Sequence, residues 1–446
     1  MATLRMKSPL AAQLELTKAC NLACIHCYNY WRYIENNKVC EQDDFSRNFE
    51  SFKFILNELI RKEIPSITFT GGEPFIRRDL LYPLVKIAKE AKMQVRINTN
   101  GSLITESDVN EMVKCGVDSV LISFSSNVQE EHSTITNTKS YNKTLEAIKL
   151  ILKTNIVVRV NMVVSNINIQ SVKSNGLFLK NIGVSHFCAT PSVSCPCAEK
   201  HSEISLEASQ IKKVLDDLLF LQEQGVNVDV LEPLTHCMFS PEERIKYMKF
   251  LTYRCCSAGI SDIAISPDGD VRACILSNTV EGNLFSDGWE KCWDDLAKWA
   301  NSDLLPEECL DCAIVDFCGG GCRVAALANT NAINGKDPYM DKPIQDFDLS
   351  AFCKHEESNL KHDALLIFDP DLRMRQEEFG GIIFGRNMSH LFLQKEAFNF
   401  VKNMWTNNKY EKFSIDSISK KHIVDHQDLT EFITHLVRNK FILTTK

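Results

Sequence analysis

The chain has 446 residues, which exceeds one ordinary domain and allows large cores that need no metal for their stability. Its 44% hydrophobic and 24% charged residues are typical of a soluble globular protein, and a formal net charge of -8 gives no electrostatic reason to expect nucleic acid. The first residues, MATLRMKSPLAAQLEL, lack the apolar core of a signal peptide, and no run of about 18 apolar residues could cross a bilayer. We therefore expect a cytoplasmic protein that binds a small molecule or another protein, and neither nucleic acid nor a membrane.

Short β-rich runs alternate with segments of helical period over residues 1–225. Strands are expected at 12–17, 66–71, 94–100, 119–125, 157–164 and 184–190, and helices at 45–62, 79–92, 105–116 and 141–154. Six βα repeats with nearly continuous apolar strands predict an α/β fold, a partial (β/α)6 TIM-like barrel. In such sheets, functional sites gather at the C-terminal ends of the strands.

Two further regions follow the predicted barrel. Residues 226–361 are irregular and rich in cysteine, with a β-hairpin expected at 262–274 around the turn Asp268-Gly269. Residues 362–446 predict paired strands at 362–386, helices at 389–405, 414–422 and 429–440, and a last strand at 441–445. Strands combined with three short helices indicate a separate winged-helix module.

Cysteine usage points to metal binding. Eighteen cysteines in a chain without an export signal do not suit a disulfide framework, because the cytosol keeps thiols reduced. The segment TKACNLACIHC places Cys20, Cys24 and Cys27 directly after the first expected strand, with no fourth cysteine nearby. Three such cysteines fit an incomplete zinc site, or a [4Fe-4S] cluster with one iron left open for a substrate or cofactor.

The next strand end carries a second motif, Gly71-Gly72-Glu73-Pro74, in the segment TFTGGEPFIRRDL. Two glycines allow a ligand to approach the backbone closely, and a carboxylate suits an ammonium group. Together the cysteine loop and this tetrapeptide resemble the radical S-adenosylmethionine (SAM) enzymes. The resemblance implies that SAM chelates the open iron and that one electron from the cluster cleaves it to a 5'-deoxyadenosyl radical.

Later strand ends add two weaker candidates for SAM contacts. Asn98, in the segment NTNG, and Ser123, in ISFSS, match positions that contact ribose and carboxylate in relatives of the radical SAM family. The fourth strand departs from the usual Ser-Leu-Asp-Gly, because it reads Ser-Phe-Ser-Ser and lacks the carboxylate. We expect Asn98 and Ser123 to bind the cofactor.

A second group of cysteines follows the barrel. Its densest part is the four-cysteine run Cys309, Cys312, Cys318 and Cys322, for which a zinc ribbon is the alternative when the run is taken alone. The complete spacing resembles the SPASM extension of radical SAM enzymes, which holds two auxiliary [4Fe-4S] clusters, three clusters in all. The resemblance assigns Cys309, Cys312, Cys318 and Cys353 to a distal cluster and Cys256, Cys274 and Cys322 to a proximal cluster.

The proximal set is one ligand short. Cys255 is adjacent in sequence, although neighbouring side chains rarely point at one metal, and Cys237 and Cys292 are other candidates. The alternative is an open iron that binds a substrate thiolate. Both possibilities stay open from the sequence.

The last region resembles the peptide-chaperone fold typified by the pyrroloquinoline quinone carrier protein (PqqD-like), also called the RiPP recognition element. The resemblance rests on PDLRMRQEEFGGIIF, LFLQKEAFNFVKNMW, SIDSISKKH and DLTEFITHLVRNKFIL. It implies that a precursor's leader peptide adds as a strand beside an exposed β edge. A DNA-binding winged helix is the alternative, but Lys395, Glu396, Asn399 and Lys402 do not form a basic recognition face.

These resemblances imply a radical SAM peptide maturase. We expect it to abstract hydrogen from a ribosomally made precursor peptide and to form a cross-link, most simply a thioether of the sactipeptide or ranthipeptide type, or else a carbon-carbon or carbon-oxygen bond. A flavodoxin or ferredoxin would supply the electron. The alternatives are a SPASM dehydrogenase like the anaerobic sulfatase maturases, and a non-catalytic iron-sulfur carrier or peptide chaperone.

Overall fold

The chain divides into two units, Met1–Phe352 and Cys353–Lys446, which are described separately. The computed structural model describes residues 5–29, 48–193, 204–251, 255–300, 302–347, 360–361, 363–385, 389–409, 411–421 and 425–445. The predicted ligand Cys353 lies outside these ranges. The expected boundary near residue 226 falls inside the first unit, because strands on both sides of it belong to one sheet.

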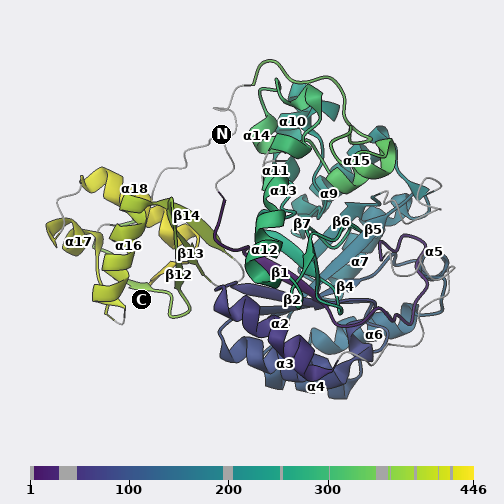
Figure 1. Cartoon of the computed structure of the whole chain (residues 1–446), viewed down its shortest axis with the longest axis horizontal. Helices are drawn as coiled ribbons and strands as arrows, with labels where there is room; N and C mark the ends of the chain where they lie inside the picture. Colours follow the sequence, from purple (N-terminus) through teal and green to yellow (C-terminus); the bar gives the residue numbers. More distant parts are fainter. Residues whose placement is uncertain are drawn as a thin grey trace. The chain divides into compact units, whose positions relative to one another are not determined.

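A ten-stranded sheet runs through the N-terminal unit in the order β10-β9-β8-β1-β2-β3-β4-β5-β6-β7 (Figure 1). The strands are β1 Ala11–Glu15, β2 Ser66–Thr70, β3 Gln94–Thr99, β4 Ser119–Ser123, β5 Val157–Val164, β6 His186–Pro191, β7 Asn227–Asp229, β8 Asp262–Ile265, β9 Asp270–Arg272 and β10 Gly282–Asn283. Neighbours from β8 through β1 to β7 are parallel, and β9 and β10 pair antiparallel. All six strands expected from the sequence are confirmed, and they are adjacent in chain order.

Amphipathic helices connect these strands and cover the sheet. They are α2 Phe49–Arg61, α3 Arg78–Glu90, α4 Glu106–Cys115, α5 Gln129–Thr136, α6 Tyr141–Ile151, α7 Val172–Asn181 and α9 Ala208–Glu223. In α2, Phe52, Ile55, Leu56 and Leu59 repeat at helical spacing and are all buried. Figure 1 shows α2, α3 and α4 side by side against the first strands of the sheet. The four expected helices are confirmed, with ends shifted by a few residues.

Buried and half-buried residues alternate along the middle strands, which separates the core face of the sheet from the face with the candidate site. In β3, Val95 and Ile97 are buried, whereas Arg96 and Asn98 on the other face are only half-buried. The longer β5 has the same alternation. Because helices cover one face, the polar residues lie on the opposite face, and the strands direct their C-terminal ends toward the loops that follow.

The cysteine-rich region extends the same sheet. The predicted hairpin forms between β8 and β9, and Gly269 takes the left-handed conformation that its turn requires, with φ +85°. Short helices follow: α10 Pro241–Lys246, α11 Met248–Leu251, α12 Gly288–Asp295, α13 Ala297–Ala300, α14 Val315–Cys318 and α15 Arg323–Thr330. Trp289, Trp293 and Trp299 join the core of the barrel. No helix in the described ranges is long and apolar enough to cross a membrane.

The C-terminal unit has its own core. Its elements are β11 Leu366–Phe368, β12 Arg373–Glu377, β13 Gly380–Phe384, β14 His390–Gln394, α16 Lys395–Asn408, α17 Ile415–Lys421, α18 His426–Arg438 and β15 Ile442–Thr444. Strands β12, β13 and β14 form an antiparallel sheet, and β11 pairs with β15. The prediction of a helix from residue 389 was wrong for residues 390–394. These residues form β14, and α16 begins only at Lys395.

Candidate functional site

The loop that carries Cys20, Cys24 and Cys27 follows β1 and is held in place by α5. All three cysteines are partly buried. The backbone N–H of Ala23 donates to the carbonyl of Thr136 at 3.2 Å, and that of Ile25 donates to Ile135 at 2.9 Å. The end of α5, a helix not expected from the sequence, therefore holds the backbone between the first and last cysteines.

The Gly-Gly-Glu turn after β2 contacts this loop through backbone hydrogen bonds. The N–H of Gly72 donates to the carbonyl of Thr17 at 2.7 Å, and the N–H of Glu73 donates to that of Ala19 at 2.8 Å. A Cβ at Gly72 would lie 2.0 Å from the Ala19 oxygen, and one at Gly71 would lie 2.5 Å from the Thr17 oxygen. Both glycines are therefore required for the turn to lie against the cysteine loop.

The carboxylate of Glu73 is fully buried and is used to hold the turn. It accepts hydrogen bonds from the Thr99 hydroxyl at 2.7 Å, the Asn100 N–H at 2.9 Å and the Phe75 N–H at 3.2 Å. Burial raises the pKa of Glu73 to about 7, and these donors oppose the shift. The carboxylate thus ties the end of β2 to the end of β3, and its expected contact with a SAM ammonium group stays a prediction.

At the end of β3, the structure brings Asn100 rather than Asn98 to the cysteine loop. The Asn100 side-chain amide donates to Asn21 Oδ1 at 3.0 Å and lies 4.0 Å from Cys20 Sγ. Asn98 lies two residues earlier, half-buried on the polar face of the sheet. Sequence reasoning singled out the NTNG segment but did not assign Asn100, because a polar residue beyond a strand end is common in loops.

Ser123 lies at the C-terminal end of β4 and is exposed. It is in register with Asn161 of β5, which is in register with Cys188 of β6, so the three positions form a row across the polar face. The amide oxygen of Asn161 accepts a hydrogen bond from Thr190 at 2.9 Å. Nothing in the sequence selected Asn161 as a candidate residue, because it lies inside a strand and belongs to no motif.

A buried ion pair joins β1 to the cysteine-rich region. Arg272 of β9 donates to the carboxylate of Glu15, and both side chains are at most 2% exposed. Burial raises the pKa of Glu15, which Arg272 opposes. Arg272 also donates to the carbonyl of Ser277 at 2.8 Å, so the pair fixes the loop that carries Cys274 relative to β1.

The three cysteines predicted for a proximal cluster lie together. Burial raises the pKa of Cys256 to about 11 and that of Cys274 to about 12, and Cys256 adds to the shift of Cys274. Burial also raises the pKa of Cys322 well above its ordinary value. The negative charges of Glu232 and Cys256 are the next largest causes of this rise. Glu232 is thus a neighbour of all three thiols, and no sequence motif indicated it.

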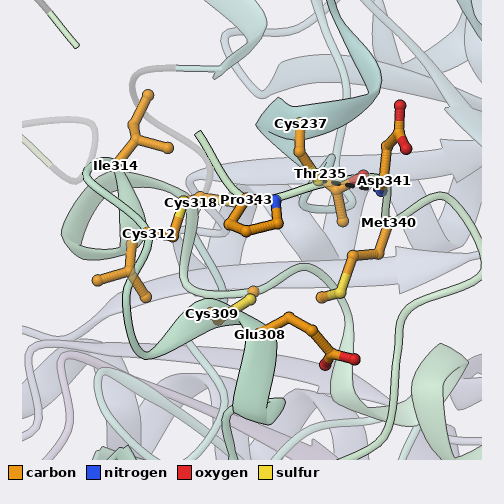
Figure 2. Close-up of a pocket in the computed structure, with 12 residues that line it drawn as sticks. Thr235, Cys237, Glu308, Cys309, Cys312, Ile314, Cys318, Met340, Asp341 and Pro343 are labelled. Carbon is orange, nitrogen blue, oxygen red and sulfur yellow. Dashed lines mark hydrogen bonds between the residues drawn. The ribbon is translucent and has the colours of Figure 1, made fainter. Parts of the chain in front are cut away.

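Three of the four cysteines predicted for a distal cluster line a cavity, shown in Figure 2, and the fourth, Cys353, lies outside the described residues. Cys309 and Cys312 line it from the segment before α14, and Cys318 lines it from the end of that helix. The fourth cysteine of the cavity is Cys237, from the short helix η3, His236–Met238. The sequence suggested Cys237 for the proximal set, whereas the structure places it here.

The other candidates for the proximal set lie elsewhere or at its margin. Cys292 is buried in α12, where its sulfur lies 2.8 Å from the position that a Cβ on Gly282 would occupy. Cys255 is exposed, and its Cβ lies 3.7 Å from the corresponding position at Gly319, in the turn after Cys318. Its role as a cluster ligand remains a prediction.

Single metal ions and iron-sulfur clusters place different demands on their ligands. Within the part of the chain that the structure describes, no three His, Cys, Asp or Glu side chains are arranged to hold one metal ion. A cubane cluster makes a different demand, because each thiolate binds a separate iron and the body of the cluster holds the ligands apart. A zinc ribbon instead requires four sulfurs around one point.

Residues 14–174 match the Radical SAM superfamily. The matched range contains both the cysteine loop and the Gly-Gly-Glu turn. The chain therefore contains a radical SAM domain, the kind of domain that binds SAM and a [4Fe-4S] cluster.

Curated relatives share about a quarter of their residues with the chain. Mycofactocin maturase MftC of Mycobacterium tuberculosis is 25% identical over 345 residues, covering 75% of this chain and 83% of the relative. The antilisterial bacteriocin subtilosin biosynthesis protein AlbA of Bacillus subtilis is 28% identical over 340 residues, covering 74% and 70%. Fe-coproporphyrin III synthase of Methanosarcina barkeri is 25% identical over 356 residues, covering 73% and 87%. A radical SAM domain with relatives named as peptide maturases identifies the chain as an enzyme.

Solved structures show the same fold. The crystal structure of Streptococcus suis SuiB bound to S-adenosylmethionine superimposes with a TM-score of 0.58 at 18% identity, covering 75% of this chain and 77% of that one. SuiB bound to its precursor peptide SuiA gives 0.58 at 16% identity, covering 75% and 76%. The likeness establishes the α/β partial-barrel fold of the N-terminal unit.

Proposed function

We propose that this radical SAM enzyme matures a ribosomally made precursor peptide. The C-terminal unit binds the leader, and the barrel abstracts hydrogen from a residue of the core peptide so that a cross-link forms. A thioether from a substrate cysteine is the first choice, and a carbon-carbon or carbon-oxygen bond is the second. Relatives named as a mycofactocin maturase, a PqqA peptide cyclase and a bacteriocin biosynthesis protein support a peptide substrate.

The observation that carries the radical chemistry is the backbone contact between the turn at 71–73 and the loop at 17–19. We assign Cys20, Cys24 and Cys27 as the ligands of the SAM-binding cluster. Gly71 to Pro74, together with Asn98 and Ser123, would line the bound SAM. When bound, the cluster supplies one electron and SAM supplies the 5'-deoxyadenosyl radical. The protein contributes the position of both, because Glu73 and the two glycines fix the turn against the loop.

Two auxiliary clusters are proposed for the cysteine-rich region. Cys256, Cys274 and Cys322 would hold the proximal cluster, and its remaining place would take the thiolate of a substrate cysteine, or Cys255. These ligands would bind as thiolates, so cluster assembly would release their protons. An open proximal iron is what makes a thioether the first choice among the cross-links.

The peptide partner is inferred from the C-terminal unit. Strands β12 and β14 are the two edges of this three-stranded sheet, and among the described residues each pairs with β13 alone, so β14 offers one of two edges for strand addition. Phe392 on β14 is 44% exposed and contacts the rings of Phe379 and His390. An edge strand with an exposed aromatic group suits an extended peptide with apolar side chains.

This unit also favours a peptide over the other substrates. Relatives of similar identity include an enzyme named for a porphyrin, so likeness in the barrel does not decide the substrate. A sulfatase-maturase-like dehydrogenase does not generally need a fused leader-binding unit, and a non-catalytic carrier would not need the Gly-Gly-Glu turn. The electron would come from a flavodoxin or ferredoxin.

Anaerobic reconstitution with iron and sulfide, followed by reduction in the presence of SAM, tests the proposal. We expect 5'-deoxyadenosine from the wild-type protein and none from Cys24→Ala. With the precursor peptide encoded nearby, the product should lose two hydrogens per link, and a thioether should also protect the linked cysteine from alkylation. An unchanged peptide mass together with active SAM cleavage would refute peptide cross-linking.

A further inference from the structure

The cavity in Figure 2 is lined by four cysteines from two separate segments of the chain. Cys309, Cys312 and Cys318 come from one short stretch, and Cys237 comes from about 70 residues earlier. In Figure 2, Cys237 lies above the cavity, Cys309 below it, and Cys312 and Cys318 to the left. Four sulfurs around one cavity match the number of ligands that a closed [4Fe-4S] cluster takes.

Backbone donors already point at the sulfurs of this set. The N–H of Asp341 donates to Cys237 Sγ at 3.3 Å. The N–H of Ile344 donates to Cys312 Sγ at 3.4 Å. The N–H of His236 donates to Cys318 Sγ, also at 3.4 Å. Hydrogen bonds to ligand sulfurs stabilise the thiolate charge of a bound cluster and tune its potential. Cys237 has this feature in common with the two motif cysteines.

The segment that carries Cys237 is fixed to the rest of the cavity. The hydroxyl of Thr235 donates to the carbonyl of Tyr339 at 2.9 Å. The N–H of Ala313, next to Cys312, donates to the carbonyl of Ile344 at 2.8 Å. Three segments are therefore tied together by bonds that involve no cysteine, and Cys237 is held at the cavity without help from a metal.

Apolar side chains exclude water around the same sulfurs. Ile314 and Ile344 are buried with Cys318, and Cys237 and Cys312 pack against this group. Phe317 and Phe347 add a tilted ring pair with centroids 6.1 Å apart. A dry, apolar wall with a few N–H donors is the environment that protects an iron-sulfur cluster from solvent.

We propose that Cys237 is the fourth thiolate of the set formed by Cys309, Cys312 and Cys318, and that these four, without Cys353, hold the distal auxiliary cluster. The inference rests on the proposed presence of auxiliary clusters. It differs from the assignment that the resemblance implies, in which Cys353 is the fourth distal ligand. A distal cluster closed by four thiolates has no iron for substrate and serves to carry electrons, so substrate thiolate binding falls to the proximal set alone.

Metal content of the full-length protein tests the assignment. The parent carries Cys20→Ala, Cys24→Ala and Cys27→Ala, so that auxiliary clusters alone contribute iron, about eight per chain for two [4Fe-4S] clusters. Adding Cys237→Ala should lower the iron to between about four and seven per chain and change the electron paramagnetic resonance spectrum of one cluster. Adding Cys353→Ala, or Cys115→Ala on α4 as the control, should change neither.

Thiol protection provides a second readout that needs no substitution. In the reconstituted wild-type protein, Cys237 should resist iodoacetamide as Cys309 does, and it should react after the iron is chelated under denaturing conditions. Full iron in the Cys237→Ala protein, iron loss in the Cys353→Ala protein, or rapid alkylation of Cys237 in the loaded protein would overturn the assignment. Wild-type protein with all clusters but no peptide product would refute the proposed function and leave this assignment intact.

Discussion

At the scale of single residues, Gly72 sets the distance between the Gly-Gly-Glu turn and the cysteine loop. Gly72→Ala places a methyl group 2.0 Å from the Ala19 carbonyl oxygen, a backbone atom that cannot rotate away. The turn must then move by about 1 Å, and a shift of that size at a reacting centre costs about 100-fold in rate. We expect a loss of that order in 5'-deoxyadenosine formation, measured by chromatography.

Gly288→Ala is the control for this prediction. Gly288 has φ +74° and no atom within 4 Å of an added Cβ, so the substitution introduces backbone strain without a clash. Its rate of SAM cleavage should equal that of the wild type. Equal rates for Gly72→Ala and the wild type would mean that the turn does not position SAM.

Asp108 shows how a buried carboxylate supports the site from a distance. Burial opposes its ionisation, but hydrogen bonds from Arg78, Tyr82 and Thr105 outweigh burial and hold the pKa of Asp108 well below its usual range. Because the folded-state pKa is depressed, this stabilisation is present above the unfolded pKa of about 4 and is lost as pH falls through the folded value.

Asp108→Asn should therefore destabilise the N-terminal unit in a pH-dependent way. We expect a loss of about 2 kcal/mol in the free energy of unfolding at pH 7, which shrinks below about pH 4, because the unfolded wild-type chain then binds a proton that the folded carboxylate does not. Urea titrations followed by circular dichroism at several pH values measure it. Glu111→Gln, which breaks an exposed pair with Lys114, should cost under about 0.5 kcal/mol, and an equal pH-independent loss in both variants would contradict the assignment.

At the scale of secondary-structure elements, the ion pair between β1 and β9 couples the strand before the cysteine loop to the cysteine-rich region. Arg272→Met leaves the Glu15 carboxylate buried without its partner, which should destabilise the N-terminal unit by about 3–5 kcal/mol. The double variant Glu15→Leu, Arg272→Met removes both charges and should recover most of that loss. Thermal unfolding of the wild type, the single variants Arg272→Met and Glu15→Leu, and the double variant measures the coupling in a double-mutant cycle.

Arg61→Met provides a matched control for Arg272→Met, because its partner Glu58 is on the same exposed helix face. It should change the free energy of unfolding by less than about 1 kcal/mol. A double variant no more stable than Arg272→Met would show that the pair does not act as a unit.

The sequence predicts the regular elements of the barrel well, because apolar alternation and helical period are local patterns. All six strands and the two glycines of the turn follow from such patterns. Strand β14 was missed because no Gly or Pro separates it from α16, so the helical period of 395–408 was extended through it. Cys237 could not be assigned from spacing, since only the tertiary fold brings η3 beside α14.

At the scale of the whole molecule, the proposed function assigns peptide recognition to the C-terminal unit and radical chemistry to the N-terminal unit. Each has its own hydrophobic core, so a surface change in one is not expected to unfold the other. The N-terminal unit contains the matched radical SAM domain, and the C-terminal unit offers the free edge of β14. Substitutions on that edge should therefore separate peptide binding from SAM cleavage.

Phe392→Ala tests this division in the full-length enzyme. Loss of an exposed aromatic contact at a strand-addition edge should cost about 1–2 kcal/mol, a 5- to 30-fold rise in the Kd of the leader peptide, measured by fluorescence anisotropy. Leu365→Ala removes a similarly exposed apolar group beside β11 and should leave the Kd unchanged. Both variants should form 5'-deoxyadenosine at the wild-type rate when no peptide is added. Unchanged leader affinity in Phe392→Ala would remove the β14 edge as the docking site, because a strand added there must lie against the exposed ring.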